Sequence, residues 1–415
     1  MPCIDTYSDK CTWEFEFIVP RYLEEESDED YGEMLPTRVI CSGELVEQVK
    51  RSLQPVDTIL TWCSLQIAHP YNSNKTIYLF TQAVLTSVQH ISFAAGPFHM
   101  HTVPADSSSE DTSQQPQIYT FCLPGMENML STTTSTLRSA MSFYSSEFGS
   151  YPFGSYKIVF VDELPTQRFD ASTMCIASAD ILHGDDAIEP AIESRHLLSH
   201  ALAVQWIGVN IQPKTWSDLW LVNGLAAYIS GLFIRKLLGN NEYRFRMKRD
   251  MQRVVQMDNG TMPPICEPHH LDPPGSRYLP FINLKAPLVL HILDRRLGKS
   301  GTSLGLSRVL PKVFLSAISG EMQNNALSTH AFLRMCRKVS GVDLRMFADQ
   351  WIYGSGCPSF HVSANFNRKK MAVEITMRQE CPAWVASEAD EVQRLLLKPV
   401  HFFEVFLISL SMDIS

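Results

Sequence analysis

The sequence has no closely spaced cysteine pair, no long uninterrupted apolar run and no excess of positive charge. Its ten cysteines are scattered without a CxxC pair, and no secretory leader is evident. We therefore expect reduced thiols in the cytosol or nucleus. The most apolar stretch, residues 219–234, is shorter than the roughly 20 residues that span a bilayer, and it contains Asn223, Tyr228 and Ser230. This predicts a buried helix and no membrane partner.

The formal net charge is −9, which disfavours non-specific nucleic-acid binding by the whole chain. Phosphate groups are bound mainly by Lys and Arg, so any DNA contact must be local. The chain has 415 residues, of which 45% are hydrophobic and 19% are charged. These values indicate a globular protein with two or three domains.

Hydrophobic periodicity divides the chain into β-rich and helical parts, which predicts a multidomain α+β protein. Alternating, aromatic-rich runs predict a β domain over residues 1–104, and a polar stretch predicts a linker at 105–119. Helical patterns fill residues 120–352, apart from one predicted strand at 156–163. Alternation returns after residue 357, which predicts a second β domain over 357–415.

One helix resembles a metal-binding helix in its spacing but lacks the residues that hold the metal. Glu189 and Pro190 are a suitable helix start. Zinc peptidases place two histidines four residues apart and a glutamate beside the first. His196 and His200 have that spacing, but Leu197 stands where the glutamate is needed. The alternative register begins with His200.

In that register, 'HALAVQWIG' (200–208) followed by 'WSDLWLVNGLAAY' (216–228) resembles the gluzincin aminopeptidases of the aminopeptidase N family. The resemblance implies a thermolysin-like, mainly helical domain. His200 matches the family's first zinc ligand, Ala201 replaces the general base, Val204 replaces the second ligand and Asn223 replaces the third.

Two further motifs of that family are also altered. 'STMCI' (172–176) resembles the substrate-gripping GAMEN stretch, with Cys175 in place of its glutamate. 'NLKAP' (283–287) resembles the YxKGA stretch, with Asn283 in place of its tyrosine. Valine has no lone pair for a metal, and without metal or base no hydroxide nucleophile forms near neutral pH. We therefore predict a non-catalytic protein without metal or other cofactor.

Longer stretches resemble a narrower family, the aminopeptidase-like TBP-associated factors of the general transcription factor TFIID. They include 'PCIDTYSDKCTWEFEFIV' (2–19), 'ISFAAGPF' (91–98), 'WSDLWLVNGLAAYISGLFIRKLLGNNEYR' (216–244) and 'FNRKKMAVEITMRQ' (366–379). The resemblance implies a partial N-terminal β saddle, an inactive gluzincin domain and the start of a β-sandwich. It also implies a longer parent subunit, from whose pattern the ending 'VFLISLSMDIS' departs as an aberrant C-terminus.

The same resemblance implies a scaffold in the nucleus, with TBP, other TBP-associated factors and core-promoter DNA as partners. The best basic stretch for DNA is 235–253, and an ordinary solvated helix face is its alternative. Its cations are Arg235, Lys236, Arg244, Arg246, Lys248, Arg249 and Arg253. A second patch, 367–370, is predicted to be a hairpin tip. A working zinc aminopeptidase and a peptide-binding pseudo-peptidase are the alternative functions.

Overall fold

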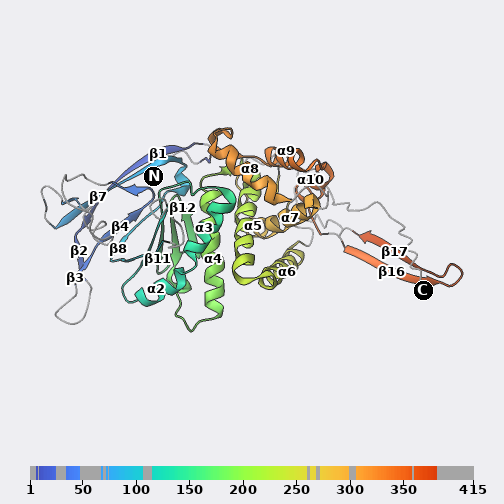
Figure 1. Cartoon of the computed structure of the whole chain (residues 1–415), viewed down its shortest axis with the longest axis horizontal. Helices are drawn as coiled ribbons and strands as arrows, with labels where there is room; N and C mark the ends of the chain where they lie inside the picture. Colours follow the sequence, from blue (N-terminus) through green and yellow to red (C-terminus); the bar gives the residue numbers. More distant parts are fainter. Residues whose placement is uncertain are drawn as a thin grey trace. The chain divides into compact units, whose positions relative to one another are not determined.

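The computed structural model describes most of the chain (Figure 1). The described residues divide into two units. The described residues are 6–7, 9–24, 34–46, 67–68, 72, 74–105, 115–258, 262–267, 272–298, 305–357 and 359–380. Unit 1 comprises residues 1–214, 229–237 and 314–326, and unit 2 comprises residues 215–228, 238–313 and 327–415. The predicted aberrant C-terminus lies outside the described residues.

Strands occur mainly before residue 180 and again near residue 370. They are β1 (Cys11–Pro20), β2 (Tyr22–Glu24), β3 (Met34–Pro36), β4 (Arg38–Cys41), β5 (Glu44–Leu45), β6 (Ile67–Ala68), β7 (Lys75–Thr86), β8 (Phe93–Gly96), β9 (His99–Thr102), β10 (Gln117–Cys122), β11 (Ser155–Val161), β12 (Arg168–Ala171), β13 (Met174–Ser178), β14 (Gln212–Pro213), β15 (Ala326–Leu327), β16 (Ser359–Asn367) and β17 (Ala372–Glu380).

Helices dominate the middle of the chain, as its periodicity predicts. They are α2 (Glu127–Thr134), α3 (Leu137–Phe148), α4 (Glu189–Trp206), α5 (Leu219–Leu238), α6 (Asn240–Met257), α7 (Leu279–Gly298), α8 (Leu306–Ile318), α9 (Thr329–Ser340) and α10 (Arg345–Trp351). Residues of α5 and α8 are shared between the two units. Together with the strands, these helices give a mixed α and β fold.

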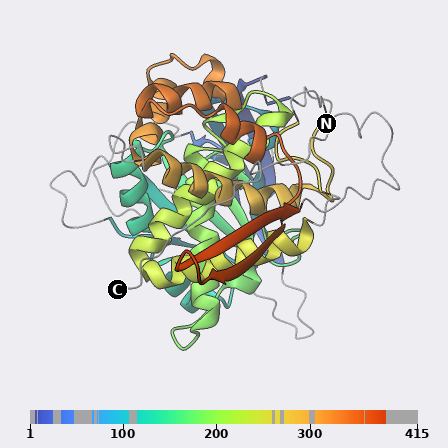
Figure 2. The ribbon, with the colours of Figure 1, turned by 90° about the vertical axis from the view of Figure 1, so that its right-hand side faces the viewer.

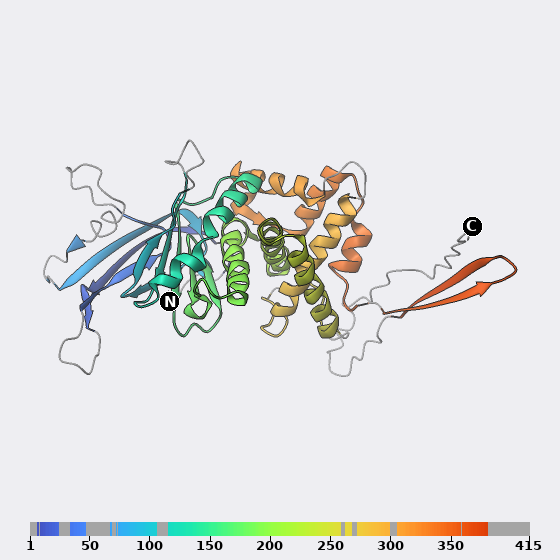
Figure 3. The same ribbon diagram turned by 60° about the horizontal axis from the view of Figure 1, so that its bottom comes forward.

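The central sheet of unit 1 has the strand order β12-β13-β11-β10-β9. Strands β10, β11 and β13 are parallel, and the outer strands β9 and β12 are antiparallel to their neighbours. Residues 155–160 of β11 are all buried, as expected for a parallel strand covered on both faces. Helices α3 and α4 lie along one face of this sheet (Figures 1 and 3).

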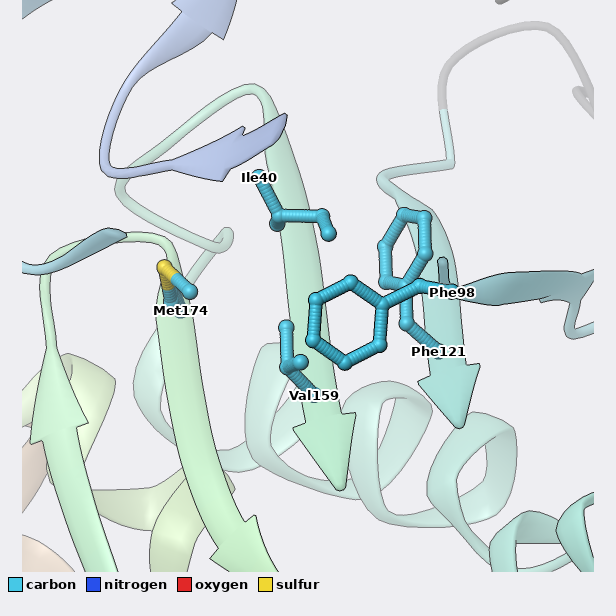
Figure 4. Close-up of a cluster of buried hydrophobic side chains, with 5 residues drawn as sticks. All are labelled: Ile40, Phe98, Phe121, Val159 and Met174. Atoms are coloured by element: carbon cyan, nitrogen blue, oxygen red, sulfur yellow. The ribbon is translucent and has the colours of Figure 1, made fainter. Parts of the chain in front are cut away.

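A hydrophobic cluster joins the early strands to this sheet (Figure 4). It is formed by Ile40, Phe98, Phe121, Val159 and Met174, each at most 5% exposed. The first two precede residue 105 in sequence, whereas the other three lie on β10, β11 and β13. Burying these side chains is worth roughly 1.5–3 kcal/mol each, so the early strands and the sheet share one core.

The sheet also crosses the boundary that we predict near residue 105. Thr102 of β9 pairs with Tyr119 of β10, so the last residues of the predicted 105–119 linker belong to a strand. The polar composition of the preceding residues conceals the start of this strand. The helical pattern that follows β10 is divided into two helices, Glu127–Thr134 and Leu137–Phe148.

The apolar helix α5 has the burial of a core helix. Within the described part of the chain, residues 216–238 form a stretch long and apolar enough to cross a membrane by length and composition. Leu221, Leu225 and Ile229 have no exposed surface. The prediction of a buried helix at 219–234 is confirmed.

In unit 2, α5 and α7 approach closely at a glycine of the recognised motif. A Cβ atom on Gly224 would lie 2.8 Å from the Cβ of Ala286, so any larger residue would force the helices apart. Trp220 is 1% exposed and donates a hydrogen bond to the Thr329 hydroxyl at 3.0 Å. These motif residues serve helix packing. Helices α6 and α7 run side by side in the same unit (Figure 3).

Strands β16 and β17 form an antiparallel hairpin (Figures 1 and 2). Its tip lies at residues 368–371, which confirms the predicted hairpin tip at 367–370. Phe360, Val362 and Phe366 share one face and are 40%, 63% and 51% exposed. A two-stranded hairpin is marginal in water on its own, so we expect this apolar face to pack against further polypeptide.

Candidate functional site

The motif helix α4 carries His200, Ala201 and Val204. Ala201 is completely buried. Val204 packs against the end of its own helix, where a Cβ atom added to Gly208 would lie 2.7 Å from the Val204 Cγ1 atom. The two positions aligned with the general base and the second zinc ligand therefore hold aliphatic side chains, Ala201 buried and Val204 partly buried.

An arginine of strand β12 contacts His200, the one residue that matches a zinc ligand of the family. Arg168 of β12 lies with its Nη2 atom 2.9 Å from Nδ1 of His200. The same guanidinium donates from Nη1 to the Leu197 carbonyl at 2.9 Å and from Nε to Asp170 Oδ2 at 2.9 Å. All three of its nitrogens are used, which ties β12 to α4.

This contact decides the protonation of His200. Arginine has no acceptor atom, so Nδ1 of His200 must accept the hydrogen bond. A neutral ring then carries its proton on Nε2, which leaves no lone pair for a metal ion. Burial lowers the pKa of His200 well below 6.5, and the Arg168 charge lowers it further. The ring is therefore neutral, with Nδ1 already bonded to a cation.

Cys175, in place of the family's substrate-binding glutamate, is an unreactive thiol. It lies on β13 and has no exposed surface. Burial raises the pKa of Cys175 well above its usual value, and the nearby Asp170 carboxylate raises it further. Because thiolates rather than thiols bind metals and attack electrophiles, Cys175 has neither role in this environment.

The turn between β12 and β13 keeps a strained conformation. Thr173 is buried and has a φ of 62°, a left-handed conformation that is costly for a residue with a branched Cβ. Its backbone N–H donates to Gln205 Oε1 at 3.0 Å, and Gln205 Nε2 donates to the Ala171 carbonyl at 2.9 Å. The buried glutamine of the α4 motif therefore fixes the turn.

In unit 2 the remaining motif positions pair with each other. Asn223 Nδ2 donates to Asn283 Oδ1 at 2.9 Å. Lys285 of the 'NLKAP' stretch forms a buried ion pair with Asp258, with Nζ and Oδ2 2.9 Å apart. Neutral amides therefore stand at the position aligned with a zinc ligand and at the position aligned with the family's tyrosine. The lysine of the motif forms a buried ion pair.

These residues do not fit a catalytic zinc ion, which needs three protein ligands and an open position for water. Among the residues that the structure describes, no group of three or more His, Cys, Asp and Glu side chains is placed to hold a metal. His200 is hydrogen-bonded to the Arg168 guanidinium. A valine, Val204, and an amide, Asn223, stand at the two positions that the motif alignment matches to the other zinc ligands.

A surface hollow of about 390 Å³ lies elsewhere in unit 1, beside α2 and the start of α4. Thr132, His183 and Arg195 are among its lining residues, and none of the aligned motif positions lines it. The Thr132 hydroxyl donates to Asp185 at 2.8 Å. This hollow is therefore separate from the residues of the zinc motif.

The structure distinguishes the cations predicted to bind DNA. Arg246 pairs with Glu242 at 2.7 Å, and both side chains are mostly buried. Lys236 lies over the Phe143 ring at 5.1 Å. Arg249 is partly buried. The exposed cations of α6 are Arg244, Lys248 and Arg253.

Sequence reasoning missed a second basic surface, on α9. Arg334, Arg337 and Lys338 are exposed there, and α9 contains no Asp or Glu. The usable signal was the absence of acidic residues from a helix with cations at i, i+3 and i+4. A search for the highest density of Lys and Arg alone selects residues 235–253 and not α9.

Comparison with known proteins agrees with this geometry. The peptidase family M1 domain matches residues 131–351. Transcription initiation factor TFIID subunit 2 of Schizosaccharomyces pombe is 37% identical over 420 aligned residues, covering 91% of this chain and 34% of that protein. The Saccharomyces cerevisiae subunit of the same name is 30% identical and has the same coverage of both chains. The chain spans about a third of these relatives' length.

A solved structure supports the same fold. Legionella pneumophila aminopeptidase A, crystallised in complex with aspartic acid, superimposes with a TM-score of 0.67 and 14% identity. The match covers 90% of this chain and 38% of that one. At this identity the likeness concerns the fold alone. The sequence matches confirm both resemblances predicted from the motifs.

Proposed function

The chain belongs to peptidase family M1, and from that membership and its similarity to TFIID subunit 2 we propose that it is a non-catalytic scaffold subunit of TFIID in the nucleus. It would contribute to complex assembly and to core-promoter DNA binding in RNA polymerase II initiation. TBP and other TBP-associated factors are the proposed protein partners. This chain covers about a third of the length of these relatives, and the proposed function is that of the whole protein.

The contact between Arg168 and His200 carries the non-catalytic part of this proposal. A metalloprotease needs an open, electron-rich site, whereas this histidine accepts a hydrogen bond from a guanidinium cation at 2.9 Å. Loss of the base at Ala201 alone would reduce the rate by about 10²- to 10⁴-fold. A working aminopeptidase is therefore disfavoured, whereas a scaffold needs only the buried packing of motif tryptophans such as Trp206 and Trp220.

We propose the domain division that the sequence predicts, with a β saddle over residues 1–104, a linker over 105–119, an inactive gluzincin domain over 120–352 and the start of a β-sandwich from 357. Strand β9 of the saddle then pairs with β10 across the linker. The apolar face of the β16–β17 hairpin supports the proposed β-sandwich. We propose that DNA contact involves the exposed cations of α6, namely Arg244, Lys248 and Arg253, because phosphates bind accessible Lys and Arg.

Affinity purification of the tagged protein from nuclear extract of its own cells tests the scaffold. We expect TBP and other TFIID subunits to co-purify at stoichiometric levels, and an untagged strain gives the background. Recovery of the protein without any TFIID subunit would contradict the proposal. A hydrolase assay on the same eluate separates a scaffold from a peptidase that happens to associate with the complex.

A further inference from the structure

The outer face of α9 is basic along its whole length. Thr329, Phe332, Cys336 and Ser340 are buried and face the interior of unit 2. His330, Arg334, Arg337 and Lys338 are exposed and lie within a single arc on the opposite side of the helix. The helix begins with Ser328, which accepts a hydrogen bond from the Ala331 N–H at 3.2 Å.

Local stabilisation accounts for only part of this charge. Cations in the last helical turn gain about 0.3–1 kcal/mol from the helix dipole, which suits Arg337 and Lys338. Arg334 lies mid-helix, outside the last turn, and its Nη2 atom is 3.4 Å from Nδ1 of His330 on the same face. Among the described residues, none of the three cations forms an ion pair within 4 Å, and the nearby Asp343 is bonded to Arg345 at 2.7 Å.

The absence of large apolar side chains on this face indicates what kind of partner it fits. The outer side of α6 alternates its cations with Phe245, Met251 and Val255, which are 60%, 40% and 61% exposed. Such a mixture also suits a protein partner, whose interface core is apolar. The exposed face of α9 offers charge alone, which complements the repeated negative charges of a phosphate backbone.

We propose that His330, Arg334, Arg337 and Lys338 form a second phosphate-binding surface for duplex DNA, which we name the α9 surface. The proposal rests on the proposed function, because it places DNA within reach of this chain in the assembled complex. It adds to α6 a contact that reads no base sequence. Its binding should therefore be salt-dependent and indifferent to promoter sequence.

The test compares Arg334→Gln/Arg337→Gln/Lys338→Gln with the unaltered protein, each assembled into the complete complex. Promoter affinity is measured over a range of salt concentrations. At about 0.15 M salt we expect affinity to fall on the order of 100-fold. The plot of log affinity against log salt should become less steep, with the magnitude of its negative slope smaller by about 2.7 for three lost phosphate contacts. Arg345→Gln combined with Asp343→Asn is the control, because it removes an exposed charge pair without changing the net charge beside α9; it should change neither quantity.

Circular dichroism and subunit composition of the variant complex exclude unfolding as the cause. Unchanged affinity and salt slope in the glutamine variant would overturn the α9 surface. Loss of a protein subunit with normal DNA affinity would also overturn it and would assign the face to an acidic protein. If α6 charge reversal weakens DNA binding while the α9 variant does not, the proposed function stands without this second surface. If the protein does not enter the complex at all, the proposed function fails first.

Discussion

Replacing Arg168 with methionine should lower the free energy of unfolding of unit 1 by about 3–5 kcal/mol, because it removes one partner of a buried ion pair. The side chains of Arg168 and Asp170 are only 16% and 15% exposed. Arg168 Nε donates to Asp170 Oδ2 at 2.9 Å, and the buried Oδ1 atom has no hydrogen-bond partner among the described residues. Without Arg168 the carboxylate stays buried and uncompensated, and β12 loses its bond to α4.

Chemical denaturation followed by tryptophan fluorescence measures this loss, since Trp206 is buried in the same unit. Arg168→Lys should cause an intermediate loss, because one ammonium cannot reproduce the three guanidinium bonds. Arg168→Met combined with Asp170→Leu should recover much of the stability, because no buried charge remains. A loss below about 1 kcal/mol in the single variant would contradict the role of Arg168.

The pH dependence of stability gives a second signature of the same contact. The pKa of His200 lies well below 6.5 in the folded chain. The neutral ring therefore contributes stability that is complete above the unfolded pKa and is lost as pH falls toward the folded pKa. In Arg168→Met only burial still lowers this pKa, so it should rise, and the contribution of His200 to acid destabilisation should shrink.

Charge reversal of Arg244, Lys248 and Arg253 should weaken promoter binding of the assembled complex on the order of 100-fold at about 0.15 M salt. These three cations are exposed on α6, and each would release counterions from a phosphate. Replacing Arg246 with glutamine should leave the affinity nearly unchanged, because Arg246 is paired with Glu242 at 2.7 Å. Footprinting with salt titration measures both.

If Arg246→Gln weakened promoter binding as much as the triple charge reversal, the assignment of the exposed α6 cations to DNA would be contradicted. Binding that is unaffected by the triple reversal would remove α6 from the DNA surface. The subunit composition of the variant complex must also be measured. Phe245, Met251 and Val255 are exposed on the same helix and could contact a protein subunit. A reversal that expels a protein subunit acts on assembly and not on DNA.

The proposed loss of the zinc motif rests on the sequence, because the aligned positions lie at fixed spacing on one helix and its successor. His200, Val204 and Asn223 follow directly from the alignment with 'HALAVQWIG' and 'LWLVNG'. The burial of α5 could also be predicted from the sequence, since its apolar residues cover every side of the helix. Spacing within one element is the strongest signal that a single sequence offers.

Arg168 could not be found in this way. It lies 32 residues before His200, on a four-residue strand with no motif of its own. Only the pairing of β12 with β13 brings its guanidinium to α4. The pairing of β9 with β10 across the polar stretch is a second example, because long-range strand contacts leave no local pattern.

The central claim is that this chain keeps an aminopeptidase fold without a metal centre. Metal content by inductively coupled plasma mass spectrometry, after incubation of the purified chain with zinc and dialysis, tests it most directly. The claim predicts no stoichiometric zinc and no turnover of amino-acid anilides in the same sample. One tightly held zinc per chain, with hydrolysis that a chelator abolishes, would contradict it.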